Sequence, residues 1–136
     1  MILIDSDLGG AGLSGQLVPE LGRLTMLKKL SLYDNSIDGP IPRELGNLMH
    51  LEDLILYSNK LTGPIPDTFG NLVNLKTLCD SQLYGNSLSG PVPPSMKNIR
   101  NLIETDIKGN NLCGPFTKRC IDYSAPHQCT DDHSCQ

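Results

Sequence analysis

Residues 24–47 read LTMLKKLSLYDNSIDGPIPRELGN, and residues 48–71 read LMHLEDLILYSNKLTGPIPDTFGN. The two segments are equally long, and leucine, asparagine, glycine and proline fall at the same positions in both. The pattern continues on either side, so the chain divides into a partial copy 1–23 and full or nearly full copies 24–47, 48–71, 72–98 and 99–116. A sustained period of this length is typical of a solenoid in which each copy forms one coil.

Alternating leucines inside each copy predict a short strand. In Leu30-Ser31-Leu32 the two leucines point to one side and Ser31 to the other. One copy is too short to bury its own leucines, but stacked copies share a core in which each fully buried leucine contributes roughly 1.5–3 kcal/mol. We therefore expect an α/β repeat fold of four to five coils, with parallel strands on one face and single helical turns, such as residues 43–48, on the other. Gly39 and its counterparts suit a tight second bend.

An asparagine follows the strand in every full copy. We expect its amide to be buried and to pair with backbone groups of its own turn and of the neighbouring coil, which would otherwise lose their hydrogen bonds. This structural asparagine column consists of Asn35, Asn59, Asn86 and Asn110.

Composition and motifs argue against several functions. The net charge is −4 with a pI near 5.2, which does not fit a nucleic-acid binder. The sequence contains no run of about 18 apolar residues, which is the length needed to span a bilayer. His50 reads as an exposed polar residue, and Asp5 and Asp7 read as a solvated face without a visible partner. Because no nucleophile, base and orienting group occur together, we expect a non-enzyme without a cofactor or resident metal.

The repeat columns resemble those of plant extracellular leucine-rich repeats. The match is closest to the ectodomains of somatic embryogenesis receptor kinases and related small secreted proteins, through residues 13–24, 32–48 and 110–115. The resemblance covers about residues 2–120. It implies a right-handed, curved solenoid whose function is recognition of a protein or peptide, including a receptor-kinase ectodomain, in signalling or defence.

The cysteines leave several pairings open. The resemblance implies that Cys113 and Cys120 form a capping disulfide, which would stabilise the last coil by about 2–3 kcal/mol. Cys129 and Cys135 could form a second bridge within the tail, residues 117–136, which leaves Cys79 as a free thiol. A zinc site in the tail is the weaker alternative. Its ligands would be Cys120, His127, Cys129, His133 and Cys135.

The chain also departs from the family it resembles. Met1 opens almost directly on the first copy, without a secretory signal or a paired-cysteine cap, and no Asn-x-Ser/Thr sequon occurs. The third copy has three extra residues, near 79–81. The resemblance to secreted and receptor proteins implies a location outside the cell, in the apoplast. The missing signal leaves truncation or an intracellular location as the alternatives.

The residues that flank the two inward leucines of each strand should form a binding surface on the concave face. In the resembling receptor kinases a tyrosine in the matching column contacts partners, which transfers to Tyr33 and Tyr57, and to Tyr84 after the insertion. The alternative is that these rings only cover the core. The remaining charged candidates on this face are Lys29, Asp53 and Glu104.

Three functions remain open from the sequence. The first is a recognition module of receptor or co-receptor type. The second is an inhibitor of a pathogen cell-wall hydrolase such as a fungal polygalacturonase. The third is a truncated remnant without a partner.

Overall fold

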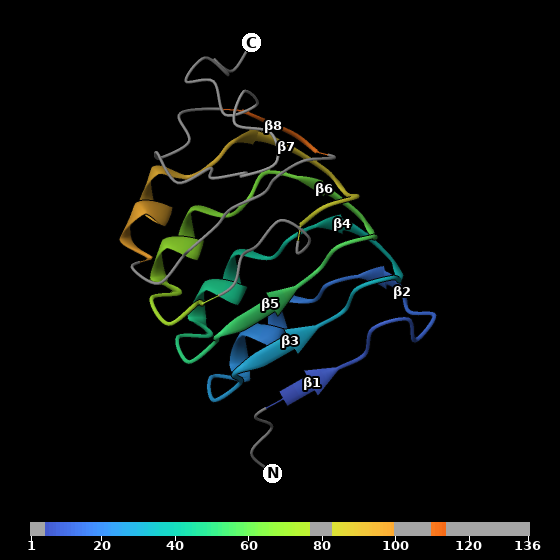
Figure 1. The fold of residues 1–136 in the computed structure, drawn as a ribbon, viewed down its shortest axis with the longest axis horizontal. Helices are drawn as coiled ribbons and strands as arrows, with labels where there is room; N and C mark the ends of the chain where they lie inside the picture. The colour runs from blue at the N-terminus through green and yellow to red at the C-terminus, as the bar shows by residue number, and fades with distance from the viewer. Residues whose placement is uncertain (1–4, 77–82, 100–109, 114–136) are drawn as a thin grey trace, which may run out of the picture.

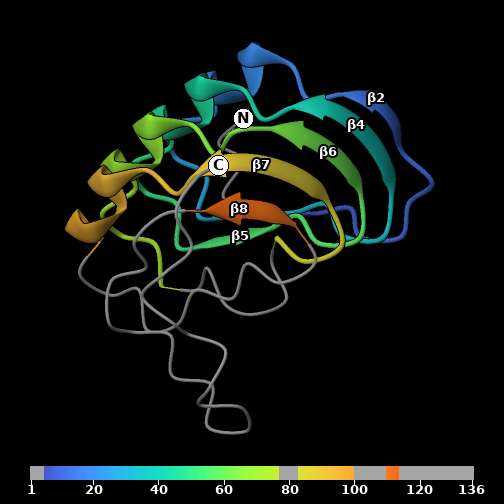
Figure 2. The same cartoon turned by 90° about the horizontal axis from the view of Figure 1, so that it is seen from above.

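In the computed structural model, residues 5–76, 83–99 and 110–113 are described. Successive coils stack along one axis, and each of the first three coils, residues 5–23, 24–47 and 48–71, has three sides (Figures 1 and 2). One side is a strand of the first sheet, the next is a strand of the second sheet, and the third is a short 3-10 helix. Because every element contacts its counterpart in the neighbouring coil, the whole stack shares one core.

The first sheet forms the concave face, and its strands run parallel as the leucine alternation predicts. Partner residues lie one repeat apart, so Lys29 pairs with Asp53 and Leu30 with Leu54. The strand order is β1-β3-β5. The bounds are β1 Asp5–Asp7, β3 Lys29–Ser31 and β5 Asp53–Ile55.

A second parallel sheet occupies the segment that the sequence analysis assigned only to a bend. Gly39 does have a left-handed backbone, with φ of 72°, but it lies inside a strand. The missed signal is that the backbone amides after each asparagine find partners in the neighbouring coil, which extends the chain there. The order is β2-β4-β6-β7-β8. The bounds are β2 Ser14–Gln16, β4 Ser36–Pro40, β6 Lys60–Gly63, β7 Ser87–Pro91 and β8 Asn111–Cys113.

Short 3-10 helices line the convex side, as predicted for residues 43–48. Pro42 and its counterparts precede these helices in extended conformation, with φ near the value that the proline ring imposes. A glycine in the first three helices lets consecutive helices approach closely: a Cβ added at Gly46 would lie 2.5 Å from the Cβ of Thr68. The bounds are η1 Pro19–Arg23, η2 Arg43–Asn47, η3 Asp67–Asn71 and η4 Pro94–Asn98.

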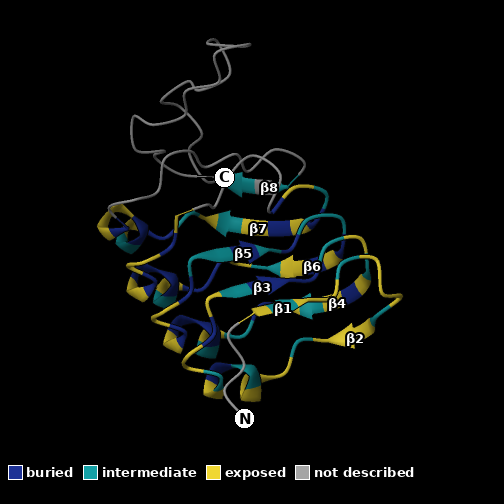
Figure 3. Ribbon diagram, turned by 60° about the horizontal axis from the view of Figure 1, so that its bottom comes forward, coloured by how far each residue is buried: buried dark blue, intermediate teal, exposed yellow. Residues whose placement is uncertain are grey.

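The core lies between these three sides (Figure 3). Leucines of the concave strands, such as Leu54, are fully buried, and Phe69 fills the place that Leu45 takes one coil earlier. The outer surfaces of the helices are exposed, so each helix buries only the side that faces the strands.

The asparagine column forms a ladder of side-chain hydrogen bonds. Asn59 accepts the backbone amide of Ile37 at 3.1 Å and donates to the carbonyl oxygens of Leu32 and Leu56 at 2.9 and 3.1 Å. The same contact to the preceding coil recurs at Asn35, Asn86 and Asn110. This is the pairing that the sequence predicts for the column.

The three extra residues of the third copy are absorbed before Leu83, which is 1% exposed in the core. Asp38 pairs with Lys60 in the second sheet, 22 residues apart, whereas Thr62 pairs with Ser87, three residues further. The insertion therefore shifts the numbering without disturbing the second sheet. Residues 77–82 themselves lie outside the described part.

Candidate binding surface on the concave face

We define the concave surface as Asp7, Lys29, Ser31, Tyr33, Asp34 and Tyr57, which lie on or directly after β1, β3 and β5. The alternation of the strands places Lys29, Ser31 and Tyr33 opposite the buried Leu30 and Leu32. Every member of this surface therefore comes from a position that the leucine core cannot use.

Tyr33 and Tyr57 stack on each other, with ring centroids 4.9 Å apart and an interplanar angle of 12°. The spacing equals the separation of neighbouring strands, because the two residues occupy the same column of adjacent coils. Both rings are half-buried. A stacked pair of this kind contributes about 0.5–1.5 kcal/mol beyond the area it buries.

Gly9 closes the other end of the stack. It occupies the tyrosine column in the first coil, and a Cβ there would overlap ring atoms Cε1 and Cζ of Tyr33. The ring of Tyr33 is thus held between the Gly9 backbone and the ring of Tyr57. Gly9 was not predicted as a site residue, although its place one repeat before Tyr33 is visible in the alignment of the copies.

Tyr84 occupies the tyrosine column in the fourth coil, residues 72–98, as expected, and its carbonyl oxygen accepts the backbone amide of Ser58 at 2.8 Å. The residue is 51% exposed. Within the described part of the chain, the stack of rings comprises Tyr33 and Tyr57 and does not continue to Tyr84. The three tyrosines were expected in one column, and the stack joins two of them.

A left-handed residue follows each tyrosine and turns the chain toward the asparagine. Asp34 and Ser58 have φ of 51° and 53°, and Gly85 has 68° in the fourth coil. Aspartate tolerates this conformation better than most residues. The turn leaves Asp34 exposed beside the tyrosine pair.

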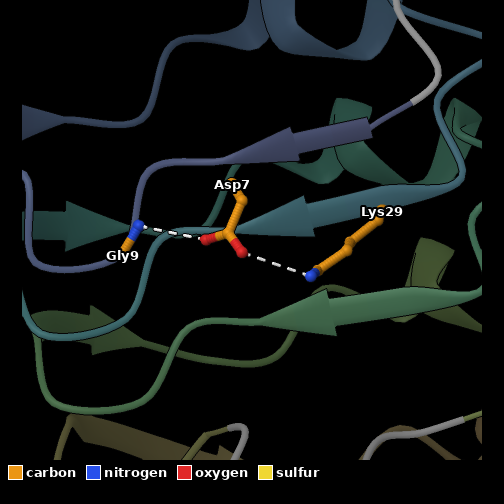
Figure 4. Close-up of polar contacts among 3 residues, drawn as sticks. All are labelled: Asp7, Gly9 and Lys29. Atoms are coloured by element: carbon orange, nitrogen blue, oxygen red, sulfur yellow. Dashed lines mark hydrogen bonds and ion pairs between the residues drawn. The ribbon is translucent and has the colours of Figure 1, made fainter.

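Asp5 and Asp7 are exposed, as predicted for a solvated face, but Asp7 has partners that the sequence did not predict (Figure 4). Its carboxylate accepts the Lys29 ammonium at 3.2 Å and the Gly9 amide at 3.3 Å. The Ser31 hydroxyl lowers the pKa of this carboxyl most, although its geometry falls short of a full hydrogen bond, and Gly9 and Lys29 add to the lowering. The missed signal is a diagonal contact, because the register places Asp5 opposite Lys29 and Asp7 opposite Ser31, two residues further along.

Ser31 is fully buried even though it belongs to the concave surface. Its neighbours in register are Asp7 and Ile55, whose larger side chains flank it on both sides. Ser31 therefore lies below the neighbouring side chains of the concave surface, between the charged pair and the tyrosine pair.

The remaining predicted site residues divide into two groups. Asp53 lies on β5 and is half-buried, in register with Lys29. Glu104, Cys120 and the zinc alternative in the tail lie outside the described residues, and the side chain of Cys113 does too. Among the described residues, no three His, Cys, Asp or Glu side chains form a metal-binding group.

An apolar cavity of about 240 Å³ opens at the first coil. Leu8 and Val18 are 45% and 50% exposed beside it. The core leucines of the second coil, Leu30 and Leu32, line its inner wall. The cavity lies under the concave sheet, so it is separate from the concave surface.

Comparison with known proteins agrees with this geometry. A family model described as Leucine Rich Repeat matches residues 26–48 and 50–72. None of the helices in the described ranges is long and apolar enough to cross a membrane.

Three solved structures illustrate the likeness. The ectodomain of the receptor kinase SOBIR1 from Arabidopsis thaliana is 30% identical over 90% of this chain, with a TM-score of 0.73. A chain of the BIR3–SERK2 complex from the same plant is 36% identical over 84% of this chain, with a TM-score of 0.69. The Arabidopsis thaliana GASSHO1/SCHENGEN3 ectodomain was solved with CASPARIAN STRIP INTEGRITY FACTOR 2. It is 33% identical over 83% of this chain, with a TM-score of 0.77. The chain spans 63%, 58% and 13% of these matched chains, less than two thirds of each.

Proposed function

The chain is a leucine-rich-repeat protein of the plant extracellular type, and from that premise we propose that it is a recognition module that binds a protein or peptide on its concave surface. The observation that carries the proposal is the stacked pair Tyr33–Tyr57. Two half-buried aromatic rings on an open sheet face offer apolar area together with two hydroxyl groups. Interfaces use tyrosine for this combination.

The structure of the surface favours binding over mere cover of the core. Leu30 and Leu54 in the same coils are 2% and 0% exposed, so the leucines form the core while the tyrosines lie on the open face. Gly9 and Tyr57 hold the Tyr33 ring from both sides, so little side-chain entropy remains to be lost when a partner binds. Preordered aromatic side chains near the centre of a patch are typical of binding hot spots.

The relatives support a partner of the same kind. GASSHO1/SCHENGEN3 was solved with CASPARIAN STRIP INTEGRITY FACTOR 2, and BIR3 with SERK2. We propose that the present chain likewise binds a peptide or a receptor-kinase ectodomain, in signalling or defence. Because these relatives are receptor ectodomains, we also propose that it acts outside the cell, in the apoplast.

A binding panel tests this proposal. Purified receptor-kinase ectodomains, including SOBIR1 and SERK2, are passed over the immobilised full chain, and a fungal polygalacturonase is assayed with and without it. Saturable binding of an ectodomain or of its peptide ligand supports the recognition module. Inhibition of the polygalacturonase without ectodomain binding would replace it with the hydrolase inhibitor, and neither response would favour a chain without these partners.

A further inference from the structure

Three exposed apolar side chains follow one side of the stack, in the turns after the convex helices η1, η2 and η3. Met26, Met49 and Val73 are 48%, 53% and 44% exposed. They are three of the six large apolar side chains that are strongly exposed in the described part of the chain. A single exposed apolar residue is ordinary, but three at matching places in consecutive coils form a strip that a partner can cover.

Side-chain hydrogen bonds hold these turns next to one another. The Nδ1–H group of His50 donates to the Thr25 carbonyl oxygen at 3.0 Å, and the Asn74 amide group donates to the Met49 carbonyl oxygen at 2.7 Å. Each bond joins the turn of one exposed apolar residue to the turn of the next. The backbone under the strip is therefore ordered before a partner arrives, which lowers the entropy that binding costs.

A column of charged residues runs beside the strip. The Glu52 backbone amide donates to the Lys28 carbonyl oxygen at 2.7 Å, and the Lys76 amide donates to the Glu52 carbonyl oxygen at 2.9 Å. The Lys76 ammonium bonds the Glu52 carboxylate at 2.6 Å, whereas Lys28 forms no ion pair among the described residues. Lys76 lowers the pKa of Glu52 most, and Lys28 adds a smaller lowering. The column therefore carries one surplus positive charge, at Lys28, in a chain whose net charge is −4.

The strip and the column together make up the lateral edge, which we define as Met26, Lys28, Met49, Glu52, Val73 and Lys76. We propose that the lateral edge is a second docking surface, for a partner segment that carries aliphatic and acidic side chains. Aliphatic groups would pack on the methionines, whose flexible thioethers adapt to different shapes, and a carboxylate would pair with Lys28. The inference goes beyond the proposed function, because it adds a contact at the side of the stack to the one on the concave surface.

The charges argue against two other occupants. A basic segment would be repelled by Lys28, because Glu52 is already paired with Lys76. A second copy of the chain, docked by a twofold axis, would bring the same surplus positive charge against itself. An acidic, partly apolar segment is the occupant that the lateral edge favours.

Methionine methyl groups report directly on this surface. The chain has four methionines: Met26 and Met49 lie on the lateral edge, Met96 is buried in the core, and the fourth is Met1. The full chain, labelled with ¹³C at these methyl groups, is titrated with the blocked peptides Gly-Leu-Asp-Leu-Glu-Gly, Gly-Leu-Lys-Leu-Lys-Gly and Gly-Ser-Asp-Ser-Glu-Gly. We expect the first peptide to shift the Met26 and Met49 signals, to leave Met96 unchanged, and to bind about fivefold more tightly than either of the others.

Two variants locate the effect. Lys28→Gln should remove the preference for the acidic leucine peptide over the basic one, whereas Lys60→Gln, the same change at an exposed lysine of β6, should leave it intact. Equal binding of these two peptides, or a preference that survives Lys28→Gln, would overturn the proposal. No shift of the Met26 and Met49 signals at millimolar peptide would overturn it as well. The ectodomain panel measures the proposed function separately, so either can fail without the other.

Discussion

The side chain of Asn59 accepts a hydrogen bond from the backbone amide of Ile37, one coil earlier, at 3.1 Å, and its amide group donates to Leu32 of that same coil at 2.9 Å. One buried side chain thus satisfies a donor and an acceptor of the neighbouring coil. Because Asn35, Asn86 and Asn110 repeat the contact, the column ties each coil to the one before it.

Replacing Asn59 with alanine should therefore lower the free energy of unfolding by about 1–3 kcal/mol, because buried backbone groups lose their partners. The measurement is urea denaturation followed by circular dichroism. Asn35→Ala is the matched variant. Asn35 makes the same contacts at the more exposed first coil, where water can replace them, so the loss should be smaller. Equal losses, or none at Asn59, would contradict the ladder.

Gly46→Ala tests the close stacking of the convex helices. The new Cβ would lie 2.5 Å from Thr68 Cβ and 2.6 Å from its carbonyl oxygen, so η2 and η3 must separate. We expect a destabilisation of about 1–3 kcal/mol, the usual cost of overpacking. Gly15→Ala is the control, because Gly15 has open space and its φ of 88° adds only backbone strain of about 1 kcal/mol. A Gly46 variant no less stable than the control would argue against the tight stacking.

Gly9→Ala tests how the tyrosine pair is positioned. The added methyl group would overlap the Tyr33 ring, which must then tilt or leave the stack. Near-UV circular dichroism, which reports on ordered tyrosines, should weaken, while the far-UV spectrum stays the same. Tyr33→Ala should weaken the same signal. An unaltered near-UV spectrum in Gly9→Ala would mean that Gly9 does not hold the ring in place.

Asp7→Asn tests the charged pair through its pH dependence. The Ser31 hydroxyl, the Gly9 amide and Lys29 lower the pKa of Asp7 below its ordinary value of 3.8. The carboxylate therefore contributes stability above about pH 3.8, and this contribution disappears as the pH falls through the lowered pKa. In thermal melts, the melting temperature of the wild type should exceed that of the variant at neutral pH. The difference should disappear below about pH 3.8. Asp67→Asn on η3 is the control, and a gap that persisted in acid would rule out the carboxylate as its cause.

Much of this fold could be predicted because each residue type that recurs in the repeat has one structural role. Alternating leucines specify a parallel strand with one buried face, and the asparagine after them specifies a turn with pairing across coils. The concave sheet, the convex helical turns and the Asn59 contacts all follow from these two rules. The second sheet could not be predicted from these rules, because Gly39 and Pro40 are of types that are rare in strands. Contacts with the adjacent coil extend the chain there regardless of propensity.

The candidate surface was predictable only in part. A shared column implies that Tyr33 and Tyr57 are neighbours, but ring orientation depends on contacts that the repeat does not encode. Gly9 supports Tyr33 from one side, whereas Tyr84 is 51% exposed and does not join the stack. Asp7 and Lys29 were likewise separate residues in the sequence, and only the register of β1 with β3 brings their charges to 3.2 Å.

The affinity of the double variant Tyr33→Ala/Tyr57→Ala for the ectodomain or peptide found in the panel tests the central claim most directly. If the concave surface is the binding site, the dissociation constant should rise at least about thirtyfold, or about 2 kcal/mol, because both rings belong to the centre of the patch. The far-UV spectrum should be retained, since the leucine core is intact. Arg43→Ala on the convex η2 should bind like wild type. A double variant that folds and binds with unchanged affinity would contradict the claim and place the site on another face.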